Sequence, residues 1–332
     1  MAEDMVVEIM NEGIMEAIKS KVKDKNKDID IEEFFKSIDY DGYFRHTLDT
    51  ISNHTLDYFE KTMYEIVMEK RNETNEFLAR QEQKWGKCFV VSDAMYIMTL
   101  EASEKYCEYV SELDKQETQN KDYLFLSLRE IHARALQQFL EITCLMKNGF
   151  ADGAYARWRS MYELSIIADF INQNGENVAK AYFEATNTND RYDWAKTAQC
   201  LKNIDRHITF ADIQRQCHFA TRDWKRQYNL ANKVVHASPQ GTFGRMSRYS
   251  ENDNLIIAGR SDYGITTPAE HSAISLVIIS SLFFTLFPNG DSLVTLKCLN
   301  EWIYIIRKYY FTAHNEIFDD DKIEFEEGER DE

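Results

Sequence analysis

Apolar residues recur at intervals of three and four along most of the chain, which is the spacing of one face of an α-helix. This spacing predicts an N-terminal helical region over 31–115. A buried stripe is expected along it, at Leu48, Ile51, Leu56, Phe59, Met63 and Ile66. Residues 1–30 are polar and lysine-rich, and we expect them to form a loose arm.

A polar stretch at 114–122 is the candidate domain boundary, and a helical hairpin is predicted after it. Its first helix spans 123–147 and stops at Asn148-Gly149. The second spans 154–174, and apolar residues surround it on almost every side, so we expect it to be central and buried. Further helices should fill 176–236.

The pattern changes after residue 238. Two short stretches, "TFGRMSRYS" and "NLIIAG", are separated by Glu251-Asn252-Asp253 and predict a small β-hairpin insertion near 242–258. Thr267-Pro268-Ala269-Glu270 then predicts a helix start with a capping box. Two apolar helices follow, separated at Pro288-Asn289-Gly290, and 317–332 is expected to be a mobile acidic tail.

Composition supports an all-α fold, because 12 glycines and 3 prolines are few for 332 residues and turn-rich β-folds need both. We therefore expect a multi-helix bundle with its core over 120–316. The most apolar run, at 273–287, is shorter than the roughly 20 residues that span a bilayer. It is interpreted as a buried core helix, and no membrane partner is expected.

The six cysteines form no C-x-x-C pair and no cluster with metal-ligand spacing. With no N-terminal signal sequence, these features predict a reduced, cytoplasmic protein. The histidines are scattered along the chain, so neither a metal nor a cofactor is expected.

Charge is distributed unevenly. The net charge is −17, which argues against non-specific binding of a polyanion by the whole surface. Residues 191–248, however, hold eleven lysines and arginines against four aspartates, a net charge of +7 that leaves −24 elsewhere. Such a region suggests a local anion site. The alternative is that its cations pair with carboxylates elsewhere in the fold.

The helix predicted at 221–236 carries the main candidate site. Arg222, Arg226, Asn229 and Lys233 follow one another at steps of four, three and four, and His236 follows three residues later. Arginine and lysine bind phosphate, and histidine transfers protons near neutral pH, so this row suits phosphodiester chemistry. The alternative is a solvated basic face on an ordinary helix.

A second set of candidates lies on the helix at 154–174. Arg159 and Glu163 are four residues apart on an otherwise apolar helix, where a buried arginine needs a partner. The pair is expected either to cross-link two helices or to line a pocket that faces the basic helix.

The segments "KNGFADGAYARWRSMYELSIIADFI" and "LANKVVHASPQG" resemble a bacterial family of unknown function over residues 120–290. Members of that family are similar to the HEPN group of helical bundles, which includes ribonucleases of toxin–antitoxin and phage-defence systems. The resemblance implies metal-independent cleavage, in which the RNA 2′-hydroxyl attacks its own phosphate with help from an arginine and a histidine. It also implies frequent dimers.

The HEPN motif is an arginine, four to six residues, and then a histidine. Counting back from His236, the permitted arginine positions hold Asn229, Leu230 and Ala231, and Arg226 lies too far away. Arg307 and His314 fit the motif and form a second candidate pair.

These observations predict an HEPN-like RNA-acting protein. The most specific form of this prediction is a metal-independent endoribonuclease of a toxin or phage-defence system. His236 would be the acid/base, with Arg226 and Asn229 beside it in the reaction. Phosphate would be held or oriented by Arg222, Asn232 and Lys233, and Arg159 and Glu163 would brace the site. Exposed aromatic residues of the basic region would stack on bases. The candidates are Tyr192, Trp194, Phe219 and Tyr228.

Two alternatives remain open. One is a non-catalytic helical adaptor whose N-terminal half binds a protein partner, and the other is a binder of a nucleotide ligand at the same basic patch. An exposed His236 in a basic groove would favour the RNA enzyme, and a closed pocket would favour the nucleotide. A protein partner or a homodimer is expected in either case.

Overall fold

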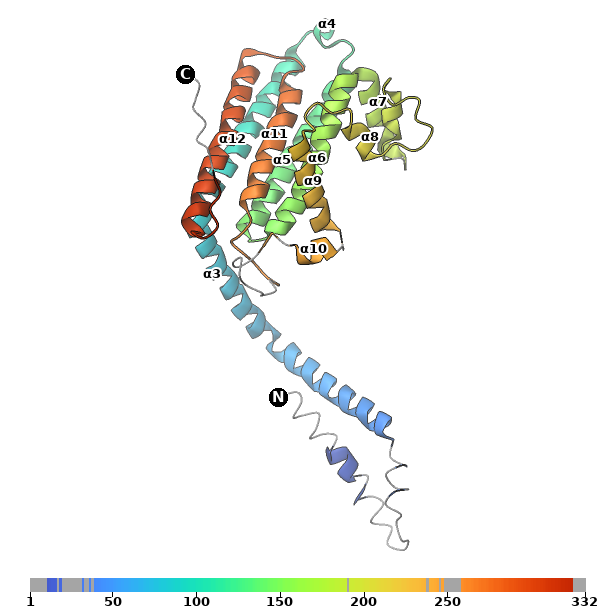
Figure 1. The fold of residues 1–332 in the computed structure, drawn as a ribbon, viewed down its shortest axis with the longest axis vertical. Helices are drawn as coiled ribbons and strands as arrows, with labels where there is room; N and C mark the ends of the chain where they lie inside the picture. Colours follow the sequence, from blue (N-terminus) through green and yellow to red (C-terminus); the bar gives the residue numbers. More distant parts are fainter. Residues whose placement is uncertain are drawn as a thin grey trace. The chain divides into compact units, whose positions relative to one another are not determined.

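The computed structural model describes residues 11–16, 18–19, 32, 36, 39–189, 191–236, 239–244, 246–247 and 258–324. The chain forms two compact units, Met1–Glu76 and Phe77–Glu332. Helix α3 (Tyr40–Glu112) contributes its first part to the first unit and the rest to the second. Throughout the described ranges every regular element is helical (Figure 1), which confirms the all-α prediction.

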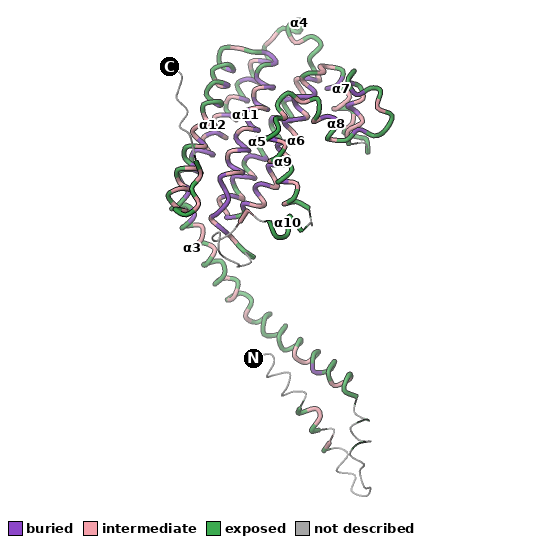
Figure 2. Tube along the Cα trace, viewed as in Figure 1, coloured by how far each residue is buried: buried purple, intermediate pink, exposed green. Residues whose placement is uncertain are grey.

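Five long helices build the core of the second unit: the later part of α3, α5 (Asp122–Lys147), α6 (Ala151–Asn174), α11 (Thr266–Phe284) and α12 (Gly290–Ile317). Helix α5 packs against α6, and α11 packs against α5, α6 and α12. Buried residues line the facing sides of these helices (Figure 2). The predicted helical bundle is therefore confirmed.

Glycines end the two helices of the predicted hairpin. Gly149 has φ +76°, its N–H donates to the carbonyl of Met146 at 3.0 Å, and the next N–H donates to that of Leu145 at 2.9 Å. This is the Schellman arrangement, and it confirms the predicted stop of the first helix. Gly175, also at φ +76°, ends α6.

Helix α6 is central, as predicted, with Trp158, Tyr162 and Phe170 fully buried. Helix α11 is likewise enclosed. It is long and apolar enough to cross a membrane, but 72% of its most apolar window is buried inside the structure. Its packing against three neighbouring helices supports the interpretation as a core helix.

The predicted capping box at the start of α11 is wrong. The helix begins at Thr266, so Thr267 is already helical, and the residue before the helix, Ile265, has no side chain that can cap. Glu270 does not fold back, because its carboxylate accepts a hydrogen bond from Arg307 of α12 at 2.6 Å.

Helix α12 has the capping box that its neighbour lacks. The amide oxygen of Asn289 accepts from the N–H of Ser292 at 2.7 Å, and the Ser292 hydroxyl accepts from the N–H of Asn289 at 3.0 Å. These two bonds satisfy groups that a helix N-terminus leaves unpaired, which explains the break predicted around Asn289.

Short elements connect α6 to the basic region: α7 (Glu176–Glu184), η1 (Ala185–Asn187), η2 (Asp193–Thr197) and α8 (Phe210–Gln214). Helix α7 packs on α5 and α6, and η2 packs on α7. The polar stretch expected as a domain boundary contains one further short helix, α4 (Lys115–Thr118).

The stripe expected to be buried along the N-terminal helix is exposed. Leu56, Phe59 and Met63 are 66%, 51% and 57% exposed. The spacing predicts the helix correctly, but burial needs a second surface, and in the described part of the first unit no element covers these side chains.

The predicted β-hairpin is wrong where it can be compared with the structure. Thr242 and Phe243 belong to a short helix, α10 (Pro239–Phe243), and no strand occurs in the described residues of 242–258. The rest of that prediction, at 245 and 248–257, lies outside the described residues.

Part of the expected acidic tail folds onto α12. The Nε2–H of His314 donates to the carbonyl of Asp321 at 2.7 Å, and the Asn315 side chain pairs with the backbone of Ile323 at 2.7 and 2.9 Å. Residues 318–324 are therefore held in place. The remainder of the tail, and of the expected N-terminal arm apart from 11–16 and 18–19, lies outside the described residues.

Candidate nucleic-acid interface

The candidate site is built on helix α9 (Arg222–Val235), which ends at His236 as the sequence predicts. The hydroxyl of Thr221 caps the helix by accepting from the N–H of Trp224 at 3.3 Å. Trp224, Tyr228 and Ala231 are buried against α6, and polar residues cover the opposite side. The helix is therefore amphipathic, with one anchored face and one free face.

Tyrosines fix the inner face of α9. The rings of Tyr162 and Tyr228 stack with centroids 4.5 Å apart. The hydroxyl of Tyr155 donates toward Gln227, whose backbone and side-chain oxygens both lie 2.8 Å away. These contacts set the rotation of α9 about its axis, so they decide which residues face solvent.

Arg159 and Glu163 form the ion pair that their spacing predicts, with 2.8 Å between Nη2 and Oε1. The Glu163 carboxylate also accepts from the Tyr228 hydroxyl at 2.8 Å and lies 3.6 Å from Arg191. Burial, followed by the nearby Glu163, raises the pKa of Tyr228 to about 12, so its hydroxyl remains a donor. The pair thus cross-links α6 to the buried face of α9.

The outer face of α9 is basic and open. An open concavity of about 850 Å³ is lined by Ala220, Arg222, Lys225, Arg226, Asn229, Leu230 and Lys233. Within the described part of the chain, none of its four cations forms an ion pair. Unpaired cations along one helix face can bind a row of phosphates.

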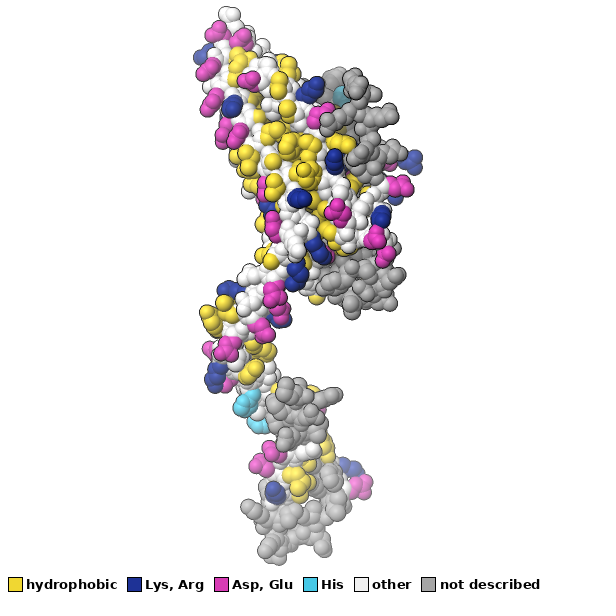
Figure 3. Space-filling view, turned by 90° about the vertical axis from the view of Figure 1, so that its left-hand side faces the viewer, with side chains coloured by type: hydrophobic (Ala, Val, Ile, Leu, Met, Phe, Trp, Pro, Cys, Tyr) yellow, Lys and Arg dark blue, Asp and Glu magenta, His cyan; other side chains and the backbone are white. Residues whose placement is uncertain are grey.

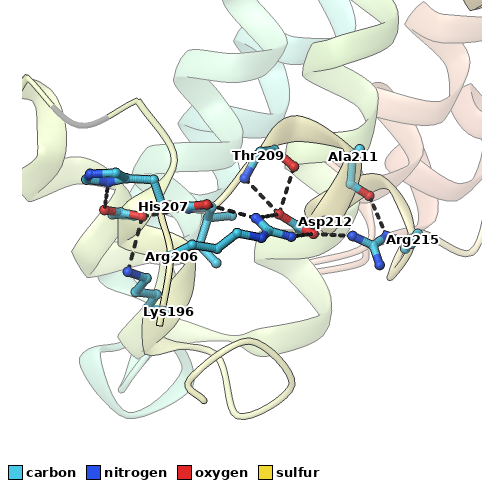
Figure 4. Close-up of polar contacts among 9 residues, drawn as sticks. Lys196, Arg206, His207, Thr209, Ala211, Asp212 and Arg215 are labelled. Atoms are coloured by element: carbon cyan, nitrogen blue, oxygen red, sulfur yellow. Dashed lines mark hydrogen bonds and ion pairs between the residues drawn. The ribbon is translucent and has the colours of Figure 1, made fainter. Parts of the chain in front are cut away.

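Other cations of the basic region are neutralised (Figure 4). The carboxylate of Asp212, 1% exposed, accepts from both Nη atoms of Arg206, at 2.6 and 2.8 Å, and also binds Arg215. The Arg206 hydrogen bonds hold the pKa of Asp212 well below its usual range. Asp193 similarly lies 3.5 Å from Lys196 and 2.6 Å from Nδ1 of His207. The region thus holds a paired cluster around Asp193 and Asp212 and the basic face of α9. Among the described residues Lys202 forms no ion pair, and Arg245 and Arg248 lie outside them.

His236 lies at the end of the open face, where it is exposed. It follows Lys233 by three positions, a rise of about 4.5 Å, but follows Arg226 by ten, a rise of about 15 Å. His236 is not among the residues that line the concavity, so it lies beyond the Lys233 end of the basic face and not within it.

Gly241 fixes the path of the chain after α9. A Cβ at this position would lie 2.0 Å from the carbonyl oxygen of Lys233 and 2.6 Å from that of His236. Glycine therefore allows α10 to pack against the C-terminal end of α9. Pro239 begins this short helix.

The two asparagines of the site differ. Asn229 is exposed and lines the concavity. Asn232 is half-buried, does not line it, and has an amide oxygen that is shielded from solvent and has no hydrogen-bond partner among the described residues. The structure therefore brings Asn229, but not Asn232, to the basic face.

The second candidate pair is not assembled into one site. Arg307 is bound to Glu270 of α11. His314, two turns later on α12, is 3% exposed and packs against the rings of Tyr263 and Phe318, while burial lowers its pKa. The two side chains engage different partners.

Few of the aromatic residues expected to stack on bases are accessible. Trp194 and Tyr228 are 7% and 8% exposed and belong to the core, whereas Phe219 is 37% exposed just before α9. Sequence reasoning missed Lys225, which lines the concavity between Arg222 and Arg226. Its position three residues after Arg222 was the available signal, since such residues share a helix face.

Comparison with known proteins gives one match. Residues 125–233, from α5 to the last turn of α9, match a family of unknown function, DUF5677. The match covers both helices of the ion-pair cross-link and most of the basic face, and it ends before His236. No curated protein and no solved structure is detectably similar to the chain.

Proposed function

We propose that the outer face of α9 binds the phosphate backbone of RNA. The observation that carries this proposal is a row of four cations on one exposed helix face, none of them paired within the described residues, in a chain whose net charge is −17. Repulsion by the acidic remainder disfavours RNA elsewhere on the surface, so the basic face selects where a polyanion docks.

An extended polymer fits this face better than a closed nucleotide site. The concavity is open, and apart from Ala220 its lining residues all come from one helix. Arg222 and Lys233 are eleven positions apart, a rise of about 16 Å, so a single nucleotide cannot reach both ends. Several consecutive phosphates can.

His236 supplies the chemistry for metal-independent cleavage at one end of the row. The 2′-oxygen of the RNA attacks the adjacent phosphorus, the bond from phosphorus to the 5′-oxygen breaks, and a 2′,3′-cyclic phosphate and a 5′-hydroxyl result. The imidazole takes the proton from the 2′-hydroxyl, water gives a proton to the leaving 5′-oxygen, and Lys233 stabilises the charge that develops on the phosphate.

The sequence resemblance supports an RNA-cleaving activity of the HEPN kind, and it supports a toxin or phage-defence system as the biological context of that activity. The adaptor alternative needs no open basic face. The exposure of His236 and the absence of ion pairs on the described cations of α9 therefore favour the RNA-acting protein.

Binding is tested with a short single-stranded RNA of mixed sequence. Replacing Arg226 and Lys233 by alanine should weaken binding about 30-fold, from roughly 1 kcal/mol for each exposed contact. The matched control removes two exposed lysines of α3, Lys87 and Lys105, and should bind as the wild type does. Equal affinity of both double variants would overturn the proposal.

Cleavage is tested separately by incubating the purified chain with RNA in EDTA. The wild type should release fragments with 2′,3′-cyclic phosphate ends, and His236→Ala should not. The control is His54→Ala, which removes an exposed histidine of the first unit. Binding without cleavage would retain the interface and refute the enzyme, and cleavage by His236→Ala would refute the assigned role of His236.

A further inference from the structure

The first part of α3 exposes an unusual number of large apolar side chains. Phe44, Leu48, Phe59 and Met63 are 46%, 42%, 51% and 57% exposed. Hydrophobic side chains of this helix lie at the surface among acidic and basic ones (Figure 3). Exposed apolar patches of this kind mark interaction sites.

These side chains form one continuous stripe. Its positions follow one another at steps of four, three, four, four, four and three: Phe44, Leu48, Ile51, Thr55, Phe59, Met63 and Ile66. Such steps keep residues on one side of a helix for about 33 Å. Asp57 and Lys61 project from the opposite side, where they pair at 2.6 Å.

A helix with such a stripe requires a partner. An isolated helix in water is marginally stable, and packing of its apolar face normally provides most of its stability. Within the described residues of the first unit, these side chains remain half-exposed. The face is therefore suited to another helix of the same kind.

The spacing of the stripe is symmetric. From Leu48 to Ile66 the steps are three, four, four, four and three, which read the same in both directions. A second copy that runs antiparallel would place Leu48 opposite Ile66, Ile51 opposite Met63, and Thr55 opposite Phe59. Apolar residues would then meet at every level except that of Thr55, which lies opposite Phe59.

Side-chain volume favours the antiparallel direction. A parallel pair would place Phe59 on Phe59 and Thr55 on Thr55, giving one overfilled and one underfilled layer. The antiparallel pair places the Phe59 ring opposite the smaller Thr55 side chain, which fills those two layers evenly.

The exposed area is also sufficient. A stable interface buries about 800 Å² on each partner. Four aromatic side chains on this face or its edge are 46–59% exposed: Tyr40, Phe44, Tyr58 and Phe59. At on the order of 100 Å² each they supply about half of that area. Leu48, Leu56, Met63 and Val67 extend the patch.

We propose that this stripe of α3 is a homodimerisation surface, on which a second copy of the chain packs with its own α3 running antiparallel. The proposal does not depend on RNA binding, because it concerns the first unit, whereas α9 lies in the second.

The oligomeric state of the full-length chain tests the surface. Sedimentation at micromolar concentration should show a dimer for the wild type and a monomer for Phe59→Glu. The matched control is Tyr64→Glu, which introduces the same charge at a side chain 74% exposed on the opposite side of the helix and should remain dimeric. A wild-type monomer, or a dimer unaffected by Phe59→Glu, would overturn the proposal.

Disulfide cross-linking tests the direction independently of that variant. It uses the full chain with the exposed cysteines Cys144, Cys200 and Cys298 changed to serine. A mixture of Ile51→Cys and Met63→Cys chains should cross-link on oxidation, and Ile51→Cys alone should not, because its two copies would lie about 18 Å apart. Cross-linking of Ile51→Cys to itself would refute the antiparallel arrangement.

Discussion

His132 shows how strongly burial controls the chemistry of a single side chain. Its Nε2 lies 3.0 Å from the hydroxyl oxygen of Ser280, between α5 and α11, and the ring is 2% exposed. Burial lowers its pKa from 6.5 to about 3. Burial is also the largest influence on His271 and His314, and it lowers both of their pKa values.

This burial predicts acid sensitivity. Because His132 has a lower pKa folded than unfolded, the unfolded chain binds the proton first, so stability is complete above pH 6.5 and falls as the pH drops toward 3. The free energy of unfolding should decrease by about 1.4 kcal/mol per pH unit from this residue. Denaturant unfolding at several pH values measures that slope.

Replacing His132 by glutamine should flatten the slope, whereas His54→Gln, at an exposed position, should not change it. An unchanged slope in His132→Gln would show that this histidine does not titrate on unfolding.

Contacts between side chains could be predicted from the sequence where the two residues are close together in the chain. The pairing of Arg159 with Glu163 follows from their separation by one helical turn. The hydrogen bonds between Arg206 and Asp212 could not be predicted in this way. Arg206 precedes α8 in a loop, and the path of a loop cannot be predicted from hydrophobic periodicity. Only the fold could therefore show which cations of the basic region are free.

At the scale of elements, the sequence predicted helices and their glycine stops well, because both depend on local backbone chemistry. The stop at Gly149 is an example. The prediction was wrong at Thr242 and Phe243, the described start of the predicted hairpin, which are helical, and at the start of α11. At the second of these, Arg307 from another helix binds the glutamate that was expected to cap.

The docking of α10 on α9 predicts an effect of Gly241→Ala. Its Cβ would lie 2.0 Å from a backbone carbonyl oxygen, so α10 must move away, and we expect a loss of about 1–3 kcal/mol. The decrease in melting temperature on thermal unfolding measures this loss of stability. Gly259→Ala is the control, since nothing lies within 4 Å of its Cβ position. Equal melting temperatures would contradict the packing of α10.

At the scale of the whole molecule, the uneven distribution of charge is the feature that sequence and structure share. Counting residues located the basic region but not its division into the paired cluster around Asp212 and the open face of α9. Periodicity likewise predicted the stripe of α3 but not its exposure, because burial depends on what else the fold places nearby.

The proposed function depends on the cations of α9 contacting phosphates, and the salt dependence of RNA binding measures this most directly. Four contacts with a single strand should give a slope of about −3 in a plot of log affinity against log salt concentration. Removing Arg226 and Lys233 should reduce its magnitude by about 1.4. A slope near zero, or one that the double variant leaves unchanged, would contradict phosphate binding by α9.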